Sequence, residues 1–156
     1  MTMTNSCTTN ALMSGLAGAS ALTLIHESAR RACPDAPRMD ILGRLSIAAG
    51  LEAAGIAPPP EDRLQALALG GEVVSNSLYY SLAALGRPSI ARGAALGAIA
   101  GLGAIALPPL MGLGHRAGAR TPQTAAMTFC WYLAGGIVAS AVHHFLADEA
   151  PLDYQI

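Results

Sequence analysis

Almost all charged residues of this chain lie in short segments between long uncharged ones. Residues 1–25, 93–114 and 121–142 contain no Asp, Glu, Lys or Arg, and residues 64–86 contain only Glu72. A helix needs about 20 mainly apolar residues to cross the hydrocarbon core of a bilayer. The pattern therefore predicts an all-α membrane protein in which four transmembrane helices form a bundle.

The four predicted spans and their connections use the whole chain, so a single domain over residues 1–156 is expected. The expected boundaries are 11–29, 64–86, 89–107 (or to 114) and 123–147. A soluble Ala-rich bundle is the competing interpretation, although a soluble helix normally has one charged face. Cleavage of the first helix as a secretory signal is a further alternative, but no basic residues precede it.

The connection between the first two spans, residues 30–63, is too long for a simple loop between helices, which takes about 2 to 8 residues. Pro34 and Pro37 predict a turn, and the apolar stripe that follows predicts a helix over 39–56. We expect this helix to lie at the inner membrane interface, in a cytoplasmic loop.

The basic residues are all Arg and are unevenly distributed among the connections. Seven lie between the first and second or the third and fourth spans, and only Arg87 and Arg92 lie in the remaining connection. Basic residues near span ends stay on the cytoplasmic side, so both termini are expected on the external side. The Arg-only, Ala- and Gly-rich composition favours a bacterial source and hence the cytoplasmic (inner) membrane.

A polar stripe runs along the second predicted span. At 100° per residue, its members share one helix face: Gln65, Glu72, Ser75, Asn76 and Tyr79. Intramembrane polar groups are costly unless they find partners, and the candidates at similar depth are Ser20, Thr23 and Tyr132. Since none of these is basic, we expect Glu72 to be protonated, donating to Tyr132, Asn76 or a hydroxyl group.

Gly93, Gly97 and Gly101 recur every fourth residue on the third predicted span. Small residues let helix backbones approach closely, so this face is expected to contact another helix, either within the chain or in a second copy. Pro108 and Pro109 are expected to end or kink the span after Leu107.

The remaining residues indicate neither an enzyme nor a metal centre. His26 and His143 are candidate ligand or interface histidines, but they are expected near opposite membrane surfaces and cannot share one metal ion. We identify no catalytic residues, metal ligands or cofactor. The net charge of -1 and the absence of Lys also argue against nucleic-acid binding.

Two functions fit these features. The first is a noncatalytic structural or accessory component of a membrane assembly, in contact with the lipid bilayer and forming a homo-oligomer or part of a larger complex. The alternative is a small ion- or solute-handling transport protein that uses the Glu72/Asn76 stripe. A water-accessible cavity at Glu72 favours the second function, whereas a fully packed Glu72 favours the first.

Overall fold

The computed structural model describes residues 2–114 and 117–148, and its described part is helical, without β-strands. The predicted all-α class is therefore confirmed. The elements in chain order are α1 (Thr2–Ala32), α2 (Met39–Ala53), α3 (Glu61–Ser81), the short 3-10 helix η1 (Leu82–Ala84), α4 (Ile90–Leu110) and α5 (Pro122–Asp148).

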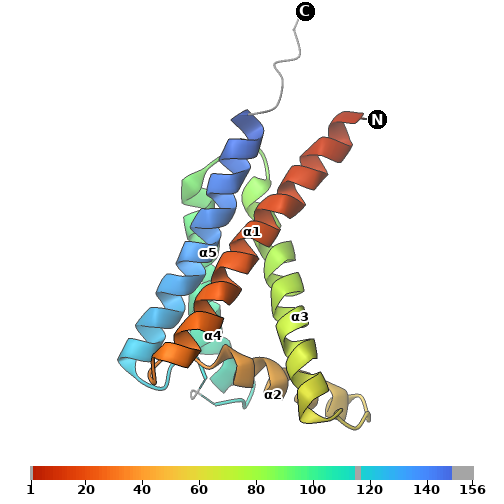
Figure 1. The fold of residues 1–156 in the computed structure, drawn as a ribbon, viewed down its shortest axis with the longest axis vertical. Helices are drawn as coiled ribbons and strands as arrows, with labels where there is room; N and C mark the ends of the chain where they lie inside the picture. Colours follow the sequence, from red (N-terminus) through yellow and green to blue (C-terminus); the bar gives the residue numbers. More distant parts are fainter. Residues whose placement is uncertain (1, 115–116, 149–156) are drawn as a thin grey trace, which may run out of the picture.

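The four long helices form an open arrangement with α1 and α5 in its middle (Figure 1). Helix α3 packs on α1, α1 packs on α5, and α5 packs on α4, whereas α3 makes few contacts with α4. Helix α2 lies across one end and packs against α3. One side of the molecule, between α3 and α4, is thus left open.

Glycine residues allow the closest helix contacts. A Cβ atom at Gly97 would lie 2.6 Å from the carbonyl oxygen of Tyr132 and 2.7 Å from Cα of Leu133, both in α5. Gly93 and Gly101 are also buried against α5. The glycine face of α4 therefore packs on another helix of the same chain.

Several helix boundaries differ from those predicted. Helix α1 begins at Thr2 instead of residue 11, and its first turns consist mainly of polar uncharged residues such as Thr, Asn and Ser. Helix α3 stops at Ser81 and passes into η1.

Helix α4 continues through Pro108 and Pro109 to Leu110. The prolines lie in its last turn, where they lack N–H donors but keep carbonyl groups that accept hydrogen bonds. The N–H of Leu113 donates to Pro108 O at 2.8 Å, and the chain turns at Gly112, whose φ is 77°. The helix therefore ends three residues after Leu107, between the two predicted ends at residues 107 and 114.

Helices α4 and α5 are long and apolar enough to cross a membrane. In the described residues, the other two predicted spans fall below this level of hydropathy. Helix α1 contains many Ser, Thr and Asn residues, and α3 begins with charged residues and contains Glu72.

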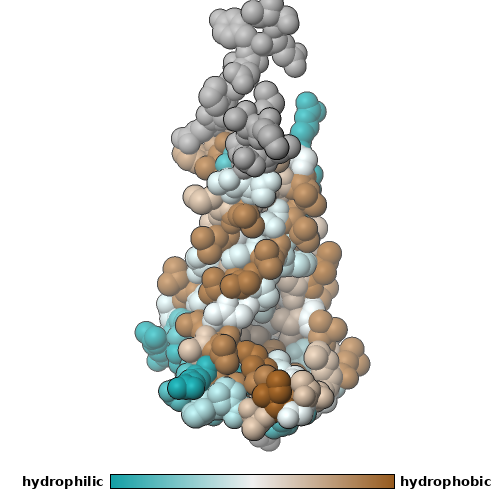
Figure 2. All heavy atoms as spheres, turned by 90° about the vertical axis from the view of Figure 1, so that its right-hand side faces the viewer, coloured by the Kyte–Doolittle hydropathy of each residue, from teal (hydrophilic) through white to brown (hydrophobic). Residues whose placement is uncertain are grey.

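Large apolar side chains are exposed along the length of the molecule. On the face seen in Figure 2, hydrophobic residues cover much of the long surface between the two ends, and the most hydrophilic residues lie near the ends. Val74, Leu78 and Leu85 are each more than half exposed, as are Ile99 and Leu102 on α4. Burial in the molecule thus leaves an extensive apolar surface uncovered.

Candidate functional site

Glu72 of α3 is paired with a histidine from α1. Its Oε1 lies 3.0 Å from Nδ1 of His26, a residue that is only 4% exposed. The side chain of Glu72 keeps 18% of its exposure. The expectation that Glu72 has no basic partner at its depth was therefore wrong, and the described side chain that it bonds is His26 instead of Tyr132, Asn76 or a hydroxyl group.

The prediction estimated the depth of each residue by counting from the end of its helix. It assumed that the helices are parallel and end at the same level. Helices α1 and α3 instead cross and diverge towards α2 (Figure 1). This angle places the last turns of α1 beside the middle of α3. A histidine expected near the membrane surface consequently meets the buried carboxyl group.

Two aromatic rings of α5 surround the imidazole. The ring centroid of His26 lies 5.4 Å from that of Trp131 and 5.7 Å from that of Tyr132. Within the part of the chain that the structure describes, Nε2 of His26 is buried without a hydrogen-bond partner. Three helices therefore meet at His26. Among the described residues, the polar contact that orients its ring is the one to Glu72.

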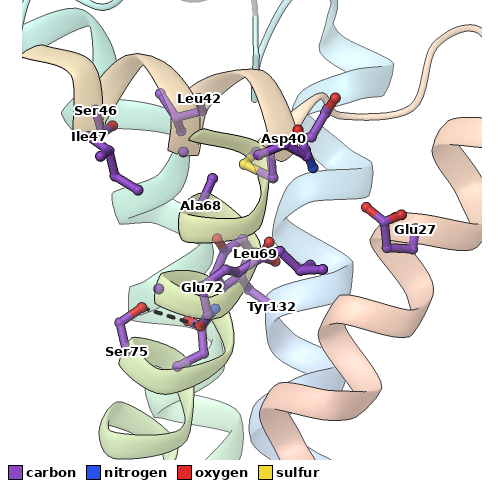
Figure 3. A pocket seen from close by; sticks show the side chains of 15 residues that line it. Glu27, Asp40, Leu42, Ser46, Ile47, Ala68, Leu69, Glu72, Ser75 and Tyr132 are labelled. Atoms are coloured by element: carbon purple, nitrogen blue, oxygen red, sulfur yellow. Dashed lines mark hydrogen bonds between the residues drawn. The ribbon is translucent and has the colours of Figure 1, made fainter. Parts of the chain in front are cut away.

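A cavity of about 380 Å³ lies beside Glu72, beneath α2. Figure 3 shows the carboxyl groups of Glu27, Asp40 and Glu72 around it, with Tyr132 beyond Glu72. Four of the five predicted stripe residues line this cavity: Gln65, Glu72, Ser75 and Asn76. His26 is not part of the lining and lies behind Glu72, so Glu72 connects the cavity to the buried imidazole.

Glu27 and Asp40 carry Arg partners. Arg30 donates two hydrogen bonds to Glu27, and Arg31 approaches it at 3.4 Å. Arg38 similarly donates two hydrogen bonds to Asp40, which holds the pKa of that carboxyl group below its ordinary value and keeps it ionised at neutral pH. Among the described residues, Glu72 is thus the cavity carboxyl group with no Arg partner.

A second, more apolar cavity of about 710 Å³ occupies the open side between α3 and α4. It contains the fifth stripe residue, Tyr79, whose hydroxyl group donates to Leu96 O at 2.9 Å. The two cavities adjoin and share five lining residues: Leu42, Ser46, Ser75, Asn76 and Tyr132. The stripe therefore borders two adjoining cavities, with Ser75 and Asn76 lining both.

The other predicted residues do not join this site. Thr23 Oγ1 is buried without a partner among the described residues, and Ser20 is half-buried. His143 is buried elsewhere on α5, with Nε2 3.5 Å from Gly86 O. In residues 2–114 and 117–148, no three His, Cys, Asp or Glu residues form a metal-binding group. His115 and Arg116 lie outside the described residues.

Sequence analysis missed the structural role of Tyr80. This residue is fully buried, and its hydroxyl group donates to Tyr132 O at 2.8 Å, which ties α3 to α5. The neighbouring Tyr79 was assigned to the polar stripe, and Tyr80, which lies 100° away around the helix, was left outside it. The sequence did contain a sign of the pairing of Glu72. His26 is a titratable residue that directly follows the uncharged residues 1–25, as Glu72 is the charged residue within 64–86.

Comparison with known proteins found no matching family model, no matching curated protein and no matching solved structure. The site must therefore be interpreted from its own chemistry.

Proposed function

We propose that this protein is a small multi-pass membrane transport protein that exchanges protons and a cationic solute at the His26–Glu72 pair. The observation that carries the proposal is the position of Glu72, bonded to a buried imidazole on one side and bordering a cavity on the other. Ionisable groups within membrane helices commonly mark ion or proton pathways.

A membrane location is supported by the apolar surface. Exposed Leu, Ile and Val side chains would be covered by lipid, and the two apolar helices α4 and α5 would span the bilayer together with α1 and α3. The α2 end would face the cytoplasm because Arg residues concentrate there. In this orientation the cavity opens towards the cytoplasmic side, and both termini are external.

The His26–Glu72 pair can hold either one proton or two. With one proton between Nδ1 and the carboxylate, neutral His26 donates to ionised Glu72, which then provides a negative charge at the cavity. Adding a second proton neutralises that charge, whether the proton resides on the imidazole or the carboxyl group. A cation and the second proton therefore compete for the same site, which is the basic requirement for exchange.

The accessory role is the second candidate, and the observation that favours it is the same contact. A buried pair between α1 and α3 can serve simply to hold the two helices together. In this case the oligomeric assembly or larger complex would use the exposed apolar faces. The two candidates differ in whether Glu72 must titrate.

Proteoliposomes with an acidic interior test the proposal. A panel of cations (Na⁺, K⁺, tetramethylammonium and tetraphenylphosphonium) is added outside, and an internal pH dye records proton efflux. We expect at least one cation to drive efflux through the wild-type protein, and Glu72→Gln to reduce it to the level of empty vesicles, because an amide cannot exchange the proton.

The matched control is Glu52→Gln, which removes an exposed carboxyl group on α2 away from both cavities. This variant should retain wild-type efflux. Equal efflux from wild-type and Glu72→Gln proteins, or no efflux above empty vesicles with any cation, would exclude the transport function and leave the accessory role.

A further inference from the structure

The two adjoining cavities differ sharply in chemistry. The cavity beneath α2 contains carboxyl groups, whereas none of the described residues that line the α3–α4 cavity is charged. Helix α4 contributes apolar residues to the latter lining, including Ile99, Ala104 and Leu107. Both volumes lie in the range typical of small-molecule sites. A ligand that fills both must therefore have a polar and an apolar part.

The charge of the polar part follows from the ion pairs. Glu27 and Asp40 are neutralised by Arg30 and Arg38, so the available charge is that of Glu72. A ligand group at this position is favoured if it is positive. An anion would meet three carboxyl groups, and the described residues of the lining include no cationic side chain.

Tyr132 stands where the two cavities join, since it lines both. A cation near an aromatic ring gains an attraction to the face of the ring, which increases when water is excluded. The side chains of Ser75 and Asn76 provide uncharged polar groups at the same junction. The junction thus suits an organic cation with little hydration better than a strongly hydrated metal ion.

Resting on the transport function proposed above, we infer that the solute is a hydrophobic organic cation. Its positive group lies next to Glu72 and Tyr132, and its apolar body occupies the α3–α4 cavity against α4. The combined site recognises charge and hydrophobic volume together, so neither feature alone gives tight binding.

Binding of such a cation should weaken as the pH falls, because protons compete for Glu72. The titratable groups that surround Glu72 are His26 and Glu27 from α1, Asp40 from α2 and Tyr132 from α5. Glu27 and Asp40 are held by Arg residues, which leaves the His26–Glu72 pair to take up the competing proton.

Equilibrium binding to the purified full-length protein in mild detergent tests this inference. The probes are tetraphenylphosphonium, the small cation tetramethylammonium and the neutral triphenylphosphine oxide. We expect tetraphenylphosphonium to bind most tightly, and Glu72→Gln to weaken its binding by about tenfold or more, equivalent to ~1.4 kcal/mol. The neutral probe should bind weakly and be unaffected by Glu72→Gln.

Gly103→Leu tests the apolar compartment separately from the charge. Gly103 lines the α3–α4 cavity but not the cavity beside Glu72, and a Cβ atom there meets only the side chain of Leu107, at 3.6 Å. The added side chain fills space without forcing the backbone to move. It should weaken tetraphenylphosphonium binding by roughly tenfold, with little effect on tetramethylammonium.

The outcomes separate the inference from the proposed function. If triphenylphosphine oxide binds as tightly as tetraphenylphosphonium and Glu72→Gln changes neither affinity, the α3–α4 cavity is an apolar groove that lipid fills. This result would overturn the inference. Proton exchange driven by Na⁺ or tetramethylammonium, with tetraphenylphosphonium binding unchanged in Gly103→Leu, would also overturn it but leave the transport function standing. Unaltered circular dichroism of both variants establishes that lost binding does not result from unfolding.

Discussion

Replacing Gly97 with Leu is expected to separate α4 from α5 and to cause the largest loss of stability of any single substitution considered for this chain. Even the first added carbon would lie 2.6 Å from the carbonyl oxygen of Tyr132. Backbone atoms of α5 cannot rotate away as a side chain can. Overpacking typically costs about 1 to 3 kcal/mol, and we expect a value of ~3 kcal/mol or more here.

Unfolding in mild detergent, followed by circular dichroism, measures this effect. Gly103→Leu is the matched control on the same helix, because the Cβ position at Gly103 contacts only the side chain of Leu107. It should unfold close to the wild-type midpoint. Similar midpoints for Gly97→Leu and Gly103→Leu would show that α4 and α5 do not pack in this register.

Replacing His26 with Ala should destabilise the protein and change the pH dependence of cation-driven proton efflux. The substitution leaves Glu72 without its partner and removes a ring that contacts Trp131 and Tyr132. Breaking a buried pair costs about 3 to 5 kcal/mol, and we expect roughly 3 kcal/mol because Glu72 still borders the cavity. His144→Ala, which alters an exposed histidine on α5, should change stability by less than ~0.5 kcal/mol.

His26→Asn distinguishes a structural link from a proton site. The Asn amide can donate a hydrogen bond to Glu72 but does not titrate. We expect this variant to recover much of the stability lost in His26→Ala and to show an altered pH dependence of efflux. If His26→Asn restores stability and its efflux has the wild-type pH profile, His26 is only an interhelical link.

The helices were largely predictable because the uncharged stretches and the prolines mark their extent. The structure begins α2 at Met39 as expected, after the turn at Pro34 and Pro37. The ends of α1 and α4 were less predictable. Polar uncharged residues extend α1, and the carbonyl groups of the α4 prolines still accept hydrogen bonds.

The site was only partly predictable, because contacts between helices depend on crossing angles that a sequence periodicity does not contain. The stripe on α3 was identified from periodicity, but the angle between α1 and α3 determines that Glu72 meets His26. The position of the stripe beside two cavities also depends on the gap between α3 and α4. That gap exists because α1 and α5 lie between the two helices, which is a property of the whole arrangement.

Infrared difference spectroscopy of the carboxyl group of Glu72 is the sharpest test of whether the His26–Glu72 pair takes up and releases a proton. Spectra of wild-type and Glu72→Gln proteins, recorded while the pH is changed, isolate the infrared bands of Glu72. If the pair exchanges a proton while the protein stays folded, these bands change with pH, either because an acid C=O band appears or because the carboxylate bands shift beside a charged imidazole, and the midpoint of the change moves in His26→Asn. A Glu72 signal that is constant over the whole pH range of the folded protein, or that is unaffected by His26→Asn, would contradict this proton exchange.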